Sequence, residues 1–113
     1  MTLATLAFIA PAQAAPSTPG GAISVAQVAE MLDQASSNRT AQQVLTAYLG
    51  GIGETAGVLV GLGSAACRRP LSLSAEEARH AIAAASAAGQ ARTLAATPLI
   101  VRDMLARAGC RRG

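Results

Sequence analysis

The side chains able to do acid–base or metal chemistry are few and form no catalytic set. His80 is the only histidine among 113 residues, and the six carboxylates make no motif beyond helix caps and surface pairs. Glu76 precedes His80 by four residues, which is the spacing of a surface pair on a helix. A metal site needs a closely spaced set of ligands, and general-base catalysis needs a nucleophile or substrate beside the base. We therefore expect no enzyme, no metal and no cofactor.

A glycine-rich stretch around Gly51–Gly57 superficially resembles a phosphate-binding loop. Its spacing is not G-x-G-x-x-G, no strand precedes it and no Gly-Lys-Ser/Thr follows, so we read Gly51 and its neighbours as structural. Each glycine within a helix costs about 1 kcal/mol relative to alanine, which indicates either a helix break or close contact between helices. Glu54 is the one carboxylate in this apolar stretch. It is a candidate partner contact or part of a solvated helix face.

The two cysteines, Cys67 and Cys110, are the only thiols of the chain. An even count in a short chain favours a disulfide in an oxidising compartment, and two unrelated buried thiols in a reducing one. A bridge that closes a loop of this length would stabilise the fold by about 4 kcal/mol on the chain-entropy model.

Residues 1–14 have the features of the end of an export signal. Leu3–Ala10 is an uncharged apolar run, Pro11 follows it, and Ala12-Gln13-Ala14 fits the small-x-small rule for cleavage. No basic residue precedes the run, so either the signal begins upstream of Met1 or the segment is a plain apolar N-terminus. We expect export with cleavage after Ala14. The run is too short to span a membrane, and we expect no other stretch to be long and apolar enough.

The rest of the chain is expected to form one helical domain over residues 23–110. Residues 15–22 are rich in proline and glycine without periodicity, which predicts a flexible leader, and residues 111–113 are expected to form an arginine-rich tail. Alanine, the best helix former, is abundant, and no alternating β-branched run or Asn-Gly hairpin occurs. We predict an all-α fold, a small bundle of four helices with one disulfide and no sheet.

Polar caps and apolar periodicity place the first two helices. Ser24 is the expected N-cap of the first, with Gln27 completing a capping box, and residues 36–38 end it. The second is expected from about Arg39 into the glycine-rich stretch, with Tyr48 on its apolar stripe.

The last two helices have equally local start signals. Ser74 is the expected N-cap of the third helix and Glu77 its capping-box partner. Thr97 is the expected N-cap of the fourth, with Pro98 at the first helical position. An earlier start near Thr93, with a kink at the proline, is the alternative.

The basic charge does not indicate a nucleic-acid partner. All nine basic residues are arginine and the net charge is +3, but the arginines are scattered apart from the pairs Arg68–Arg69 and Arg111–Arg112. No basic stripe follows a helix face, and aromatic residues that would stack on bases make up 2% of the chain. We expect no nucleic-acid binding, and we take Arg68 and Arg69 as candidate contacts to a protein partner.

Taken in order along the chain, these features resemble a known family. An apparent export signal is followed by a helix, by Tyr48-Leu49-Gly50-Gly51-Ile52, by Cys67 and Pro70 in a loop, by a capped third helix and by Ala108-Gly109-Cys110. This order is similar to the Rap/Tai family of small periplasmic immunity proteins, which protect bacteria from peptidoglycan amidase toxins delivered by type VI secretion. The resemblance covers about residues 24–110.

The resemblance implies a helical periplasmic protein whose partner is a toxin enzyme, with a loop or helix end occluding the active-site cleft. Val58–Arg69 and Ala88–Ala96 are the candidate inhibitory segments, because they lie between helices and are rich in small residues. The sequence departs from the family in three places. It lacks further cysteines near the first two helices, and Pro70 lies three residues after Cys67, not two. The segment directly before Cys110 reads Arg107-Ala108-Gly109, without the aromatic residue and proline usual in the family.

Two other functions stay open. A small periplasmic stress or chaperone-like protein, such as the acid-stress Hde proteins, would also be short, exported, helical and singly bridged, although those proteins carry more charge and lysine. An accessory subunit of an envelope complex is the third reading. A homodimer is compatible with each of them, since the glycine face of the second helix could pack across a two-fold axis.

Overall fold

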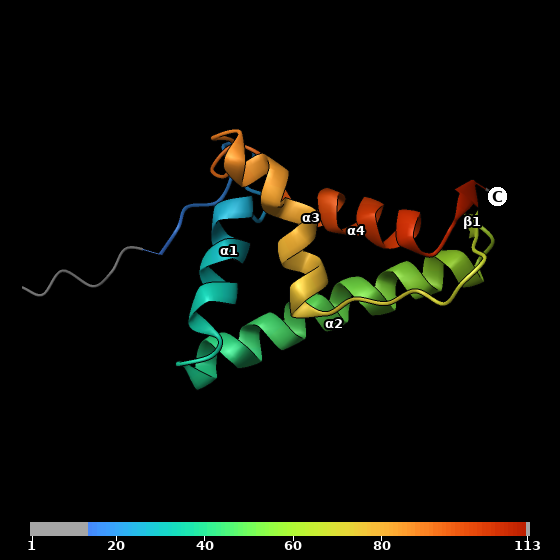
Figure 1. The fold of residues 1–113 in the computed structure, drawn as a ribbon, viewed down its shortest axis with the longest axis horizontal. Helices are drawn as coiled ribbons and strands as arrows, with labels where there is room; N and C mark the ends of the chain where they lie inside the picture. Colours follow the sequence, from blue (N-terminus) through green and yellow to red (C-terminus); the bar gives the residue numbers. More distant parts are fainter. Residues whose placement is uncertain (1–13, 113) are drawn as a thin grey trace, which may run out of the picture.

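The computed structural model describes residues 14–112, so the expected signal segment, apart from Ala14, lies outside the described residues. It contains four helices and two short strands: α1 (Val25–Gln34), α2 (Arg39–Gly61), β1 (Ala65–Ala66), α3 (Ala75–Ala87), α4 (Ala96–Arg107) and β2 (Arg111–Arg112). Figure 1 shows α1 and α3 side by side, with their lower ends on the first half of α2, while α4 runs toward the far end of α2. The predicted set of four helices is confirmed.

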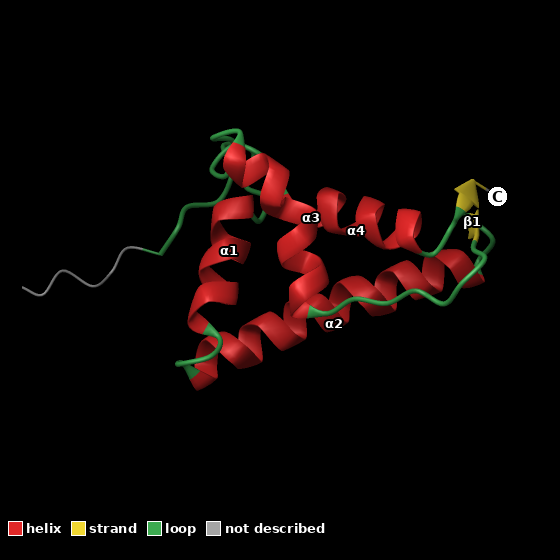
Figure 2. Cartoon of the chain, viewed as in Figure 1, coloured by secondary structure: helices red, strands yellow, loops and turns green. Residues whose placement is uncertain are grey.

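The expectation that the chain has no sheet is wrong. β1 and β2 pair antiparallel, with Ala65 opposite Arg112 and Ala66 opposite Arg111, at the far end of α2 (Figure 2). Arg111 and Arg112, expected in an arginine-rich tail, belong to a strand. Two-residue strands carry no sequence pattern, and this pair directly adjoins the disulfide between Cys67 and Cys110.

The capping signals predicted α1 and α3 correctly but not α4. Both capping boxes are present, with the hydroxyl of Ser24 accepting from the amide of Gln27 and that of Ser74 from Glu77, each at 3.1 Å. By contrast, α4 begins at Ala96 after Ala95, without a side-chain cap. Its start is set by tertiary hydrogen bonds, which a local capping pattern does not reveal.

α2 runs unbroken through all of its glycines, so the predicted helix break is wrong. The glycines make no close contact with another helix of the same chain either, because a Cβ built on Gly50, Gly51, Gly53, Gly57 or Gly61 would meet no atom within 4 Å. A separate face of the helix packs into the core and holds the helix in place. Its buried residues are Leu45, Leu49, Ile52 and Ala56.

The core is thin and drawn from all four helices. Several of its members are alanines, and the largest fully buried apolar side chains are Ile100 and Met104 of α4 with Val25 and Val28 of α1. Fully burying one such side chain contributes roughly 1.5–3 kcal/mol, whereas an alanine contributes much less. A domain with such a core is expected to have a small free energy of unfolding, so a disulfide would contribute a large share of its stability.

Residues 15–22, predicted from their composition to be a flexible leader, make hydrogen bonds among themselves and with α1 and its N-cap. The amide of Ala15 donates to Oε2 of Glu30 at 2.6 Å, and the carbonyl oxygen of Pro16 accepts from the hydroxyl of Ser24 at 2.7 Å. Thr18 is buried and its hydroxyl closes a turn by accepting from the amide of Ala22. The segment therefore follows a fixed path beside α1.

The expectation that no other stretch is long and apolar enough to span a membrane is wrong for α2, as far as length and composition go. The helix has 23 residues, and an 18-residue window of it has a mean hydropathy of 1.3, with 17% of that window buried. By length and composition alone the helix is able to cross a membrane. α2 reaches this length because it continues through the glycine-rich stretch, where a break would have left two shorter helices.

Candidate partner-binding site

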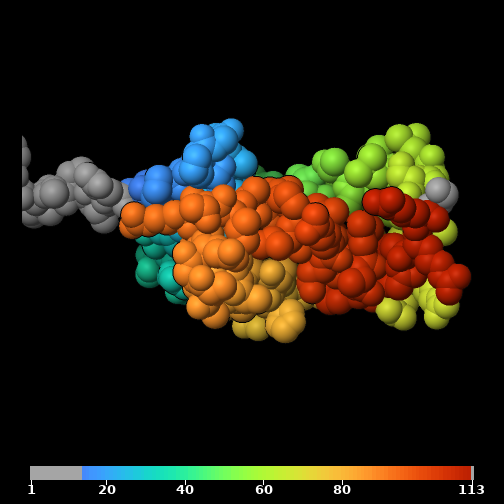
Figure 3. Space-filling model, turned by 90° about the horizontal axis from the view of Figure 1, so that it is seen from above, coloured from blue at the N-terminus to red at the C-terminus, as the bar shows by residue number. Residues whose placement is uncertain are grey.

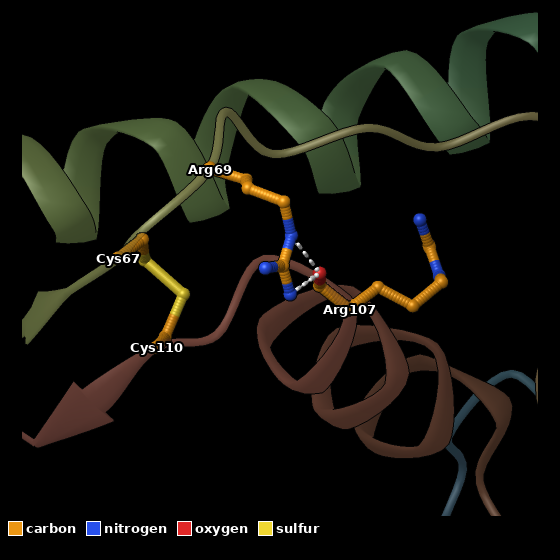
Figure 4. Close-up of a disulfide and its surroundings, with 4 residues drawn as sticks. All are labelled: Cys67, Arg69, Arg107 and Cys110. Atoms are coloured by element: carbon orange, nitrogen blue, oxygen red, sulfur yellow. Dashed lines mark hydrogen bonds between the residues drawn. A yellow bond between two sulfur atoms is a disulfide. The ribbon is translucent and has the colours of Figure 1, made fainter.

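The predicted disulfide joins Cys67 and Cys110, with an S–S distance of 2.01 Å. It links the segment that follows β1 to the residue before β2, and so ties the end of α4 to the loop that leaves α2 (Figure 4). Both thiols are used in this bond, so the chain has no free cysteine in its described part or elsewhere.

Backbone hydrogen bonds reinforce the bridge on both sides. We call residues 65–69 and 108–112 the clamped end. The amides of Arg68 and Arg69 both donate to the carbonyl oxygen of Ala108 at 3.0 Å, and the two strands pair beyond the disulfide. Gly109 has a φ of +65°, which glycine adopts without strain, and a Cβ there would lie 3.4 Å from the side chain of Arg68. The clamped end is thus held by the disulfide, by the strand pair and by the backbone hydrogen bonds to Ala108.

The two arginines expected to contact a partner have different surroundings. Arg69 donates from Nε and Nη2 to the carbonyl oxygen of Arg107, at 2.9 and 2.5 Å, and so caps the C-terminal end of α4 (Figure 4). A cation at this position also interacts favourably with the helix dipole. Arg68 is exposed and lies over Gly109. Arg68 is therefore the better candidate for a partner contact, and Arg69 supports the site.

Large apolar side chains are exposed where α2 enters the clamped end. Val58, Leu59 and Leu62, which we call the apolar ridge, have exposed fractions of 59%, 47% and 76%. Residues 57–70 and 108–112 contain four arginines and no carboxylate. In Figure 3 the end of α2 and its following loop (yellow-green) lie beside the C-terminal residues (red) at one end of the molecule. This end is therefore both apolar and cationic.

The other segment proposed as inhibitory, Ala88–Ala96, is tied into the fold. Its backbone is hydrogen-bonded to the start of α1. The amide of Val25 donates to the carbonyl oxygen of Leu94, and the amide of Ala26 donates to that of Ala91. The amide of Ala96 donates to the carbonyl oxygen of Ile23, and Ala96 itself is fully buried. This segment fixes α1 against α4, which leaves Val58–Arg69 as the stronger candidate.

Glu54 is exposed on α2, one helical turn before Val58 of the apolar ridge. It makes no ion pair with any described residue. Its position allows it to contact a partner that covers the apolar ridge, with the clamped end carrying the opposite charge.

Tyr48 and Gly51 lie in a shallow groove between α2 and α4, about 410 Å³ in volume. The hydroxyl of Tyr48 is 2.7 Å from that of Thr97. Burial raises the pKa of Tyr48 above its usual value, and the hydrogen bond to Thr97 offsets part of this rise. Tyr48 is thus a packing residue that joins the two helices.

Arg107 organises a polar cluster that sequence reasoning missed. Its guanidinium binds Asp103 at 2.8 Å, the side chain of Glu77, and both the hydroxyl and the carbonyl oxygen of Ser72, each at 2.9 Å. Glu77 therefore serves the capping box of α3 and an ion pair to α4 at once. The i, i+4 spacing of Asp103 and Arg107 could have predicted their ion pair from the sequence. The contacts of Arg107 with Ser72 and Glu77 depend instead on the tertiary fold.

The described residues contain no group of three His, Cys, Asp or Glu side chains able to hold a metal ion. His80 is exposed on α3, and no ion pair with Glu76 forms in residues 14–112. The features that stand out in the described residues are the apolar ridge and the clamped end. Comparison of the chain with family models, with curated proteins and with solved structures gave no match.

Proposed function

We propose that this chain is an exported, periplasmic immunity-type protein that binds a peptidoglycan amidase toxin and blocks its active-site cleft. The observation that carries the proposal is the clamped end, where the apolar ridge and four arginines are presented on a disulfide-braced support. The resemblance to the Rap/Tai family supplies the class of partner. The disulfide supports export, because such bonds persist in oxidising compartments.

The chemistry of the clamped end suits a protein partner. Interfaces obtain most of their affinity from a few residues, among which arginine is enriched, and burial of exposed apolar surface adds a favourable contribution. A support that is rigid before binding also reduces the entropy lost on association. Leu62 is 76% exposed and would fill an apolar recess, while Arg68, Arg111 and Arg112 would face acidic groups around it.

An accessory subunit of an envelope complex is the second candidate, favoured by one observation. α2 is long and apolar, yet its glycine face is uncovered. Such a face suits packing against another apolar helix, including that of a second copy in a homodimer. A stress or chaperone-like role would use the apolar ridge against unfolded chains, and would show no preference for one partner.

Co-purification with the product of a neighbouring toxin gene tests the proposal. We expect a stable complex, weakened by Leu62→Asp and by Arg68→Glu, which change exposed side chains at the clamped end. Arg92→Glu is the matched control, since Arg92 is equally exposed but lies in the segment beside α1. The absence of any complex with a genomic neighbour would end the immunity proposal.

A further inference from the structure

Ala15 and Glu30 meet at the point where the export signal is expected to be cut. The backbone nitrogen of Ala15 lies 2.6 Å from Oε2 of Glu30. The small-x-small pattern Ala12-Gln13-Ala14 puts the scissile bond immediately before this nitrogen. We infer that cleavage after Ala14 creates an α-amino group that docks on the Glu30 carboxylate and fixes the mature N-terminus to α1.

The chemistry of cleavage turns this hydrogen bond into an ion pair. A signal peptidase hydrolyses the Ala14–Ala15 peptide bond with one water: the C–N bond breaks, Ala14 leaves as a carboxylate, and Ala15 keeps an ammonium group. The nitrogen that donates to Glu30 as an amide then carries a full positive charge. The bond to the ionised Glu30 carboxylate is already charge-assisted before cleavage, and the ammonium group adds the Coulomb attraction of a second, opposite charge.

Glu30 is otherwise without a cation. It is partly buried, and among residues 14–112 it forms no ion pair, whereas Asp33, the other carboxylate of α1, pairs with Arg79 at 3.0 Å. Oε1 of Glu30 accepts from the side chain of Gln34 at 3.2 Å, which leaves Oε2 directed to Ala15. The new ammonium group would therefore supply the missing charge.

The residues after Ala15 set its position, so the cleavage register matters. Ser24 holds the carbonyl oxygen of Pro16, and Gln27 donates to the hydroxyl of Ser17 at 3.4 Å. Adjacent Cα atoms are about 3.8 Å apart, so a chain cut at a neighbouring bond would place its amino group at another point of the path than the nitrogen that Glu30 contacts. A sequence rule and a structural contact thus select the same bond independently.

The inference rests on the proposed export but not on toxin neutralisation. The test begins with the full chain, expressed with its export machinery, and with sequencing of the N-terminus of the purified protein. We expect Ala15 as the first residue. Any other first residue, or retention of the uncut chain, would overturn the inference. A protein that starts at Ala15 yet binds no amidase would leave it standing and count only against the toxin proposal.

Unfolding in urea then tests the docking itself. Residues 15–113 are compared with a chain that keeps Ala14, each with Glu30 and with Glu30→Gln. We expect removal of Ala14 to raise the folding equilibrium constant about five-fold when Glu30 is present, an effect that shrinks at high salt and vanishes with Glu30→Gln. Glu54→Gln, a change at an exposed carboxylate on α2, is the control that keeps the five-fold gain. Equal gains with and without the Glu30 carboxylate would refute the docking.

Discussion

The guanidinium of Arg69 caps α4 by donating two hydrogen bonds to the carbonyl oxygen of Arg107, across 38 positions of sequence. The disulfide lies beside this contact and joins the same two segments. The end of the molecule that we propose as its binding surface is therefore held by a covalent and a polar link together. Either link can be removed by mutation without the other, and we expect a different loss of stability in each case.

Removal of the disulfide should destabilise the whole domain. Cys67→Ser with Cys110→Ser frees a loop of 43 positions in the unfolded chain, for an expected loss of up to about 4 kcal/mol. The native state of a small domain is only about 5–15 kcal/mol more stable than the unfolded state, so much of the stability should disappear. Urea unfolding with and without reductant measures this loss. Equal midpoints would contradict the structural role of the bridge.

Arg69→Ala should cost about 1 kcal/mol, because the carbonyl of Arg107 loses its cap and the helix end loses a cation. Arg68→Ala is the neighbouring control and should change the free energy of unfolding little, since its side chain forms no hydrogen bond with a described residue. Thermal unfolding of the two variants in parallel gives the comparison. A larger loss for Arg68→Ala would reverse our assignment of the two roles.

Gly57→Ala should stabilise the isolated protein by up to about 1 kcal/mol. The position is helical, and a Cβ there meets no atom within 4 Å, so the substitution gains helix propensity without a clash. Gly109→Ala is the contrasting variant, and its φ of +65° predicts a loss. Sedimentation of the original and Gly57→Ala proteins tests whether the chain forms a homodimer through this face. If the glycine face packs against another chain, the substitution should weaken that association.

Tyr48 should make the fold sensitive to alkali. Because burial raises its pKa in the folded state, the neutral form is favoured, and its contribution is fully present below the unfolded pKa of about 10. That contribution is lost as the pH rises through the folded pKa. Tyr48 is the only tyrosine, so ultraviolet titration of the phenol reports it alone. Tyr48→Phe should remove this part of the pH dependence of unfolding, and Thr97→Val should raise the pKa further.

Local signals predicted the parts of the fold that local chemistry controls. The capping boxes at Ser24 and Ser74 begin two helices where expected, since each needs only a serine and a partner three residues later. The buried residues of α3, which are Ala78, Ile82 and Ala85, have the spacing of one helix face. The disulfide followed from the cysteine count together with the expected export.

The errors share a different cause, which is that tertiary contacts override local preference. Thr97 does not cap α4 because its hydroxyl faces Tyr48 and the helix start is bonded to Ile23. Residues 15–22 look flexible by composition but gain hydrogen bonds from α1 that lie outside any local pattern. The polar cluster around Arg107 joins three segments distant in sequence. Of the candidate site, the sequence indicated Arg68 and Arg69 but could not separate their roles.

The most direct test of the central claim is a titration of the neighbouring peptidoglycan amidase with the mature, oxidised protein. We expect amidase activity to fall linearly to near zero at an equimolar ratio, and Leu62→Asp with Arg68→Glu to abolish the inhibition while Arg92→Glu preserves it. Full amidase activity in the presence of excess protein would contradict the proposed function.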